Sequence, residues 1–393
     1  MKKSIFLFGL KIIGAILSLV LGMVISRFYG VEVFGLFGLI LTWSNIFSII
    51  GCWGGNVKII ENRYKIIPQE QILFFIFGAF FATLISCIFF DFKYSLWYVG
   101  LIVFPLSFLI LKSSILMLYN KQYSNSVIDD FLKYFLPLIF VLFFYFFVDY
   151  NEFFLVYLAS IFFLFISSLF IVFSSFKLSK AEKKESLLSY VKYGWVPTCS
   201  ALLILLNAQF DRIILSNIVS DKSLGYYTIA QSFTALITYI SVSVMVVITP
   251  NLVKFYQEKE FIALHHLSRK YSLFLFGISV VIFILTVVFG KLFFSLYGVT
   301  SQDGYLSLLI LLFGVALSQI FGFGMTIAAY TEDKSKLLSF QIIVFLTISI
   351  CCYFMSIKWG ILGAAISTAS GYILMKFILW LYYKRKSINV GLI

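Results

Sequence analysis

Apolar segments about twenty residues long recur along the whole chain and restrict its fold more than any other feature. A helix needs about 20 residues to cross the hydrocarbon core of a membrane. Strands of a membrane barrel would alternate over about ten residues instead of staying apolar for twenty. The predicted fold is therefore an all-α polytopic membrane protein with twelve transmembrane helices. The segments are 4–28, 33–57, 71–90, 95–118, 131–148 (interrupted by Pro137), 153–176, 190–215, 224–249, 271–290, 305–329, 337–357 and 360–383.

Composition agrees with this prediction and excludes several functional classes. Hydrophobic residues make up 62% of the 393 residues and charged residues 12%, whereas a soluble domain carries about 25% charged residues. The net charge of +13 comes from short loops, which does not predict a nucleic-acid partner. All five cysteines lie in apolar runs, and the only histidines are the adjacent His265 and His266. We therefore expect no metal site, no cofactor, no catalytic residue and no enzymatic activity.

The distribution of lysine and arginine predicts the orientation of the chain. With the N-terminus inside, 23 of the 30 cations lie in inner loops, tails and helix ends, and Lys11 lies within the first span. Six cations lie outside, namely Arg27, Lys93, Arg212, Lys222, Lys291 and Lys358. Because cytoplasmic loops carry the excess of positive charge, both termini are expected to face the cytoplasm.

A polar stretch in the middle of the chain predicts two lobes. The sequence "KLSKAEKKESLLSYVK" (177–192) separates six spans from six. The predicted parts are an N-terminal lobe (1–176), a cytoplasmic linker (177–189), and a C-terminal lobe with a cytoplasmic tail (190–393).

An internal repeat supports this division. A shift of 185 places Arg27 on Arg212, and a shift of 190 places Phe34-Gly35 on Leu224-Gly225. Each copy consists of an apolar helix, an arginine near its outer end, a glycine-bearing turn and an aromatic segment that re-enters the membrane. With six spans between the copies, the two halves have the same orientation, related by an axis along the membrane normal.

These motifs resemble a known family over essentially the whole chain. The stretch "SRFYGVEVFGLFGLI" is similar to the start of polysaccharide flippases of the MOP superfamily. Further similar stretches are "NAQFDRIILSNIVSDKSLGYYTIAQSF", "TPNLVKFY" and "WGILGAAISTASGY". The subgroup with similar length and twelve spans is that of Wzx-type O-antigen flippases. Lipid II flippases usually have fourteen spans and several arginines in the first helix, features that this chain does not share.

The resemblance implies a function, a location and partners. It implies two six-helix lobes around a central cavity in a bacterial inner membrane. It also implies translocation of an undecaprenyl-pyrophosphate-linked O-antigen repeat unit to the outer leaflet by alternating access. An O-antigen polymerase and a chain-length regulator would be partners. Two alternatives are a MATE-type multidrug exporter, which commonly has acids in its spans, and a membrane O-antigen polymerase or glycosyltransferase, which usually has a large outer loop.

Ionisable residues within spans are costly and therefore mark candidate sites. Lys11, Lys112 and Lys376 either reach back to the headgroups or form a cationic cavity floor for a pyrophosphate. Arg27 and Arg212 either anchor helix ends or bind phosphate at the outer side. Asp211, the one acid within a predicted span, is a local partner of Arg212 or the ion-coupling residue. Asn207 and Gln319 are candidates for binding the sugar or for joining helices.

Overall fold

The computed structural model describes residues 2–60, 67–89, 96–145, 152–173, 178–179 and 187–392. Ten of its helices are long and apolar enough to cross a membrane. In the described parts, the only strands are β1 (Ile67–Pro68) and β2 (Leu178–Ser179), which form one short parallel pair. The prediction of a helical polytopic membrane protein is confirmed.

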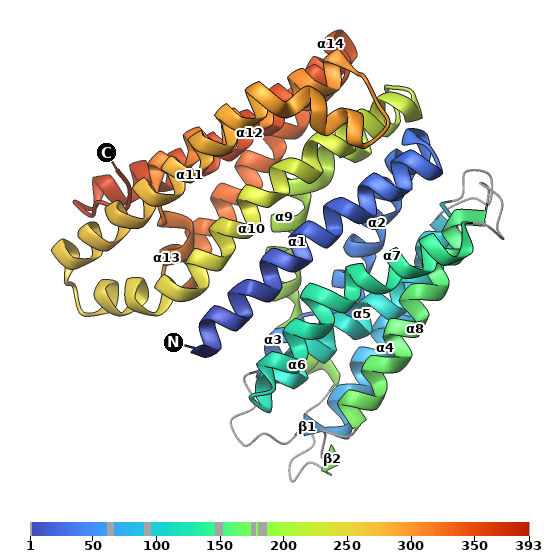
Figure 1. Cartoon of the computed structure of the whole chain (residues 1–393). Helices are drawn as coiled ribbons and strands as arrows, with labels where there is room; N and C mark the ends of the chain where they lie inside the picture. The colour runs from blue at the N-terminus through green and yellow to red at the C-terminus, as the bar shows by residue number, and fades with distance from the viewer. Residues whose placement is uncertain are drawn as a thin grey trace. The chain divides into compact units, whose positions relative to one another are not determined.

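The chain forms two compact units (Figure 1). Met1–Tyr29 and Phe37–Leu205 form the first unit, and Gly30–Leu36 and Leu206–Ile393 form the second. The boundary therefore lies within a helix, beyond the predicted linker at 177–189. Residues 180–186 of that linker lie outside the described residues, so its role stays a prediction.

The first unit combines contacts between helices that follow each other in the sequence with contacts between helices that are distant in it. Its elements are α1 (Lys2–Phe28), α2 (Val31–Cys52, of which 31–36 belong to the second unit), α3 (Gly55–Ile60), α4 (Gln69–Phe89), α5 (Tyr98–Leu118), α6 (Gln122–Ser126), the π-helix η2 (Val127–Leu132), α7 (Lys133–Phe144), α8 (Phe153–Phe173) and the start of α9 (Leu187–Ser216). Helix α5 packs on α4 and α8, and α7 packs on α1 and α8.

The second unit is organised around one helix. Its elements are the end of α9, α10 (Asp221–Gln257), α11 (Phe261–Leu296), α12 (Gln302–Ser318), the 3-10 turn η4 (Gln319–Phe321), α13 (Gly324–Tyr330) and α14 (Lys334–Arg385). Helix α12 packs on α10, α11 and α14, so it forms the centre of this unit.

Two irregular helical segments explain why ten membrane-crossing helices correspond to twelve predicted spans. Helix α14 has 52 residues and a break at Gly360, where φ is 55°. At 1.5 Å per residue, a continuous helix of that length would far exceed a hydrocarbon core about 30 Å thick, so the break separates the last two spans. The run Gln122–Phe144, interrupted by η2, corresponds to the predicted span 131–148. The observed helices are thus consistent with twelve spans.

The glycines of the repeat have two different structural roles. Gly30 has a φ of 97° in the turn between α1 and α2, a conformation that glycine adopts without strain. Gly35 and Gly225 pack against each other within the second unit. A Cβ at Gly35 would lie 2.7 Å from the Gly225 nitrogen, and one at Gly225 would lie 2.1 Å from the Val31 oxygen. The equivalent glycines of the repeat therefore permit close contact between α2 and α10.

Candidate functional site

A buried carboxylate lies at the centre of a hydrogen-bond network in the second unit. Asp211 of α9 is 6% exposed. Its Oδ2 atom accepts hydrogen bonds from Tyr227 Oη (2.5 Å), Gln231 Nε2 (2.7 Å) and Thr368 Oγ1 (2.7 Å). Tyr227 and Gln231 are four residues apart on α10 and so share one face of that helix. The donors are neutral side chains, so they hold the carboxylate without cancelling its charge.

Arg212, the next residue on α9, contacts the same network through an amide. Its backbone nitrogen donates to Asp211 Oδ1 at 2.8 Å, and its Nε atom donates to Gln231 Oε1. Among the described residues, no ion pair joins its guanidinium to a carboxylate. Gln231 therefore bridges the arginine and Asp211, donating to the acid and accepting from the cation.

A small cavity of about 20 Å³ adjoins Asp211. Asn207, Asp211, Ser349, Cys352 and Thr368 contribute to its lining. Its volume is that of roughly one water molecule or small ion. Asn207 also donates from Nδ2 to the backbone oxygen of Gln341 at 3.4 Å, so this residue joins α9 to α14.

A second cation of this unit is also held by a glutamine. Lys376 of α14 donates from Nζ to Gln319 Oε1 at 2.9 Å, and Gln319 Nε2 donates to Ser241 Oγ at 3.4 Å. Gln319 is 5% exposed. The structure thus brings together two residues that the sequence singled out separately. As with Arg212, the described residues place no carboxylate against this ammonium group.

The first unit contains a cation whose charge is neutralised. Lys112 of α5 is fully buried, and its Nζ lies 2.6 Å from Asp129 Oδ1. Ser113 Oγ donates to Asp129 Oδ2 at 2.6 Å. Asp129 and Asp130 belong to the π-helix η2, a type of insertion found frequently at functional sites. The predicted span began at residue 131 and therefore missed both acids. The apolar residues Val127 and Ile128 before them were a signal that the helix begins earlier.

The two remaining cation candidates lie on α1. Lys11 is half-buried and electrostatically attracts Asp130 of η2. The α1 backbone approaches η2 closely at Gly14, where a Cβ would lie 1.9 Å from the Asp130 oxygen. Arg27 lies in the last turn of α1 and is exposed. The repeat-equivalent arginines therefore differ, because Arg212 is half-buried in a network and Arg27 is not.

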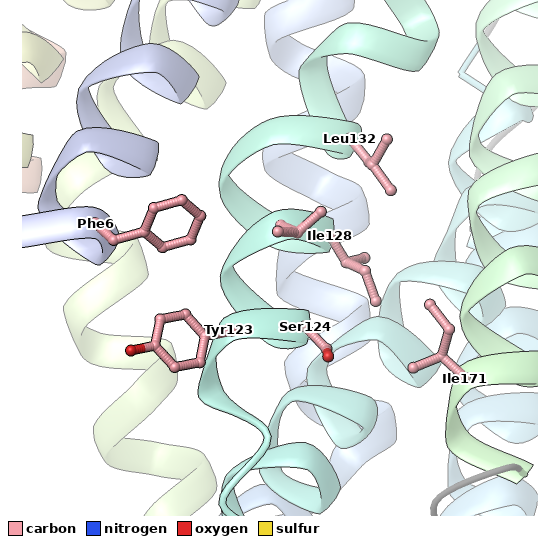
Figure 2. Close-up of a pocket in the computed structure, with 7 residues that line it drawn as sticks. Phe6, Tyr123, Ser124, Ile128, Leu132 and Ile171 are labelled. Atoms are coloured by element: carbon pink, nitrogen blue, oxygen red, sulfur yellow. The ribbon is translucent and has the colours of Figure 1, made fainter. Parts of the chain in front are cut away.

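A groove of about 640 Å³ on the first unit is largely apolar (Figure 2). Its walls include Phe6 of α1, Ile128 and Leu132 of η2, and Ile171 of α8, with Tyr123 and Ser124 of α6 on one side. None of the candidate cations lines it. The groove can contact a hydrocarbon chain, and its described lining residues include no cation to bind a phosphate.

Sequence reasoning missed several partners of the candidate residues. Tyr227 and Thr368 were not singled out, because a tyrosine and a threonine in apolar helices are common and their contacts with Asp211 are distant in the sequence. Within the described residues, no group of three or more His, Cys, Asp or Glu side chains could hold a metal ion.

Comparison with solved structures assigns the fold. A lipid II flippase, MurJ, in an inward closed conformation is similar with a TM-score of 0.75 and 16% identity, covering 97% of this chain and 87% of MurJ. An inward-facing multidrug resistance MATE transporter of the MOP superfamily has a TM-score of 0.68 and 14% identity, covering 95% and 94% of the two chains. A mutant of the Vibrio cholerae MATE transporter VcmN has a TM-score of 0.63 and 15% identity, covering 99% and 98%.

The fold is that of the MOP transporters. No protein-family model matches the sequence, and no curated protein matches it either. A lipid II flippase and multidrug transporters both have this fold, so the fold by itself does not assign a function.

Proposed function

We propose that the chain is a flippase of the inner membrane that moves a lipid-linked pyrophosphate oligosaccharide from the inner to the outer leaflet. The substrate class is an undecaprenyl-pyrophosphate-linked O-antigen repeat unit. One observation carries the proposal. Arg212 and Lys376, two cations in apolar helices, donate to the glutamine oxygens of Gln231 and Gln319. Neither forms an ion pair with an acid among the described residues.

Neutral partners suit a cation that has to bind and release an anion. A pyrophosphate that enters a low-dielectric region has to be neutralised by cations, because an unpaired charge there is very costly. Glutamine oxygens orient the ammonium and guanidinium groups without competing as strongly as a carboxylate would. The planar guanidinium of Arg212 can bind two phosphate oxygens at once, whereas Lys376 supplies a point charge.

The other candidates have supporting roles in this proposal. Lys11 and Arg27 are further cations for the pyrophosphate, and Asn207 is a hydrogen-bonding residue for the sugars. Lys112 could bind phosphate only by leaving Asp129, 2.6 Å away. The apolar groove on the first unit (Figure 2) offers hydrocarbon contact, and none of the described residues that line it is a cation.

Asp211 is the proposed ion-coupling residue. The three side-chain donors to its carboxylate are neutral, and the adjacent cavity has room for one small ion. A proton or a monovalent cation bound there would change the hydrogen bonds between α9, α10 and α14. If the ion-bound and ion-free states of this network favour different conformations of the protein, ion binding would drive alternating access.

A MATE-type exporter of cations is the alternative, and Asp211 together with the MATE structures of this fold favours it. Cationic drugs would be attracted by Asp211 and repelled by Arg212 and Lys376. An O-antigen polymerase or glycosyltransferase is a weaker alternative, because the similar solved structures are a flippase and multidrug transporters.

Deletion of the gene separates these proposals. We expect loss of surface O-antigen, build-up of undecaprenyl-linked repeat units on the cytoplasmic leaflet, and unchanged resistance to ethidium. The O-antigen polymerase and its chain-length regulator would then lack their substrate. Complementation with Arg212→Gln plus Lys376→Gln should fail, while Lys358→Gln, a control outside the network, should restore the polysaccharide. Surviving polysaccharide with increased dye sensitivity would favour the exporter.

A further inference from the structure

A break in the helix that carries Gln319 leaves backbone groups without helical partners. Helix α12 ends at Ser318, η4 covers Gln319–Phe321, and α13 begins at Gly324. Between them, Gly322 has φ 75° and ψ −142°, a region of backbone conformation open essentially only to glycine. Unpaired backbone donors and acceptors are costly in an apolar environment, so this break needs partners from another segment.

The strap segment, defined as Ile388–Leu392, supplies these partners. The backbone nitrogen of Phe323 donates to the Val390 oxygen at 3.0 Å. The nitrogen of Leu392 donates to the oxygen of Ile320 at 2.9 Å. Val390 is fully buried and Ile388 is 5% exposed. The strap therefore pairs with the break on both sides of Gly322, in the manner of a short strand.

The fit between the strap and the break is close. A Cβ at Gly391 would lie 2.7 Å from the Ile320 oxygen, and one at Gly322 would lie 1.8 Å from the Val390 oxygen. Because the contacted atoms belong to the backbone, they cannot move aside as a side chain could. A methyl group at either glycine would separate the two segments.

A buried acid fixes the start of the strap. Lys386 donates from Nζ to Asp333 Oδ1 at 2.8 Å. Asp333 also accepts hydrogen bonds from the hydroxyls of Tyr256 (3.0 Å), Tyr382 (2.6 Å) and Tyr383 (3.0 Å). The backbone nitrogen of Ile388 donates to the Tyr383 oxygen at 2.9 Å. The strap thus leaves the end of α14 in a fixed direction.

We propose that the strap is a positioning element for Lys376, the cation that the proposed function assigns to the pyrophosphate. The strap holds Ile320, and Ile320 directly follows Gln319, whose Oε1 atom receives the Lys376 ammonium at 2.9 Å. When the strap is bound, Gln319 keeps its place and Lys376 is oriented. The inference rests on the proposed function only for the identity of the ligand.

Transport measurements in proteoliposomes test this role by asking whether the effects of changes in the strap and at Lys376 are additive. Gly391→Ala is the disruptive change, and Asn389→Ala, at an exposed position of the strap, is its control. With a fluorescent polyprenyl-pyrophosphate oligosaccharide as probe, we expect Gly391→Ala to raise the apparent KM about tenfold and Asn389→Ala to leave it unchanged. In a Lys376→Gln background, Gly391→Ala should have no further effect, whereas in an Arg212→Gln background it should keep its full effect.

A second pair of variants isolates the backbone hydrogen bond. Leu392→Pro removes the donor to Ile320, while Leu392→Ala keeps it. Only the proline variant should reproduce the effect of Gly391→Ala. An equal increase in KM with and without Lys376 would show that the strap acts on the whole unit and would overturn the proposal.

Cysteine labelling separates this proposal from the proposed function. In a chain with its own five cysteines replaced, Gln319→Cys should react with a methanethiosulfonate at least five times faster after Gly391→Ala, and at the same rate after Asn389→Ala. An unchanged rate after Gly391→Ala would overturn the inference. A faster labelling rate after Gly391→Ala would support the conclusion that the strap positions residue 319. If the same protein moved no pyrophosphate lipid, the flippase assignment alone would be wrong.

Discussion

Within the apolar helices, the two units hold charge in opposite ways, whereas the Asp333–Lys386 ion pair of the second unit lies at the ends of α14. In the first unit, Lys112 and Asp129 neutralise each other at 2.6 Å. In the second unit, Asp211 is surrounded by neutral donors, and Arg212 donates its Nε–H to an amide oxygen. An ion pair whose members satisfy each other stabilises a structure but is a poor ligand. Charges held by neutral groups remain available, and for this reason we place the functional charges in the second unit.

The internal repeat places different residue types at equivalent positions of the two halves. At the repeat shifts of 185 and 190, Asp211 corresponds to Ser26, Tyr227 to Phe37 and Gln231 to Leu41. In the first unit, Phe37 packs edge-on against Phe153 and Tyr157, with ring centroids 5.8 and 4.7 Å apart. The polar network of one half is therefore replaced by aromatic packing in the other.

The largest expected effect is on the stability of the first unit. Lys112→Met leaves the partly exposed carboxylate of Asp129 without its cation, which should lower the free energy of unfolding by about 2–3 kcal/mol, the contribution of a hydrogen bond to a charged group. Adding Asp129→Leu should recover most of this loss, because replacing both members of a buried pair by apolar residues is often neutral. Thermal denaturation in detergent measures both variants. If the double variant were less stable than Lys112→Met, Asp129 would have to stabilise the first unit through contacts other than its ion pair with Lys112.

The second effect concerns transport by the second unit. Asp211→Asn keeps the size of the side chain and removes its charge, so we expect at least a tenfold loss of transport per inserted molecule with insertion unchanged. Glu32→Gln, at an exposed acid in the first turn of α2, is the matched control and should transport normally. Full activity of Asp211→Asn would exclude Asp211 as the coupling residue.

The two arginines of the repeat give a smaller and more specific contrast. Arg212→Lys keeps the charge but loses the planar fork, so transport should fall about fivefold. Arg27→Lys, at an exposed position, should change transport less than twofold. Equal losses at the two positions, measured with the same lipid-linked substrate, would mean that the arginines act as an equivalent pair.

The last effect is a pH dependence at Asp333. Burial alone would raise the pKa of this carboxyl, but the hydrogen bonds from Lys386, Tyr382 and Tyr256 lower it below its usual range. The stabilising contribution is therefore present above the unfolded pKa of about 3.9 and is lost as the pH falls through the folded value. Asp333→Asn should cost about 1–2 kcal/mol at neutral pH.

Thermal denaturation as a function of pH checks this assignment. The difference between wild type and Asp333→Asn should stay constant between pH 6 and 8 and shrink as the pH falls below about 4. A difference that grows on acidification would contradict a lowered pKa. The strap contacts should weaken in parallel, because Lys386 loses its partner.

Local patterns in the sequence predicted the helices but not every contact between them. Apolar runs located the spans, and Gly30 marked the turn between α1 and α2. The fifth predicted span began too late, at residue 131, because Asp129 and Asp130 looked like loop residues. Within η2, Asp129 contacts Lys112 and Ser113, and Asp130 is attracted by Lys11. The break at Gly322 was not predicted, since its stability comes from the strap almost seventy residues later.

The candidate site was predictable by residue but not by partner. The cost of charge in an apolar span is a local property, so Asp211, Arg212 and Lys376 could be singled out from the sequence. Their neighbours come from other helices, 157 residues away for Asp211 and Thr368, and no spacing rule connects them. Gln319 was singled out as a lone polar residue, and only the structure joins it to Lys376.

Direct transport of two probes by the purified protein tests the central claim. Liposomes containing wild-type protein should move a fluorescent polyprenyl-pyrophosphate oligosaccharide between leaflets, detected by its loss of protection from a membrane-impermeant quencher. They should not accumulate ethidium under a sodium or proton gradient, and Arg212→Gln plus Lys376→Gln should abolish movement of the lipid. Accumulation of ethidium without movement of the pyrophosphate lipid would contradict the account.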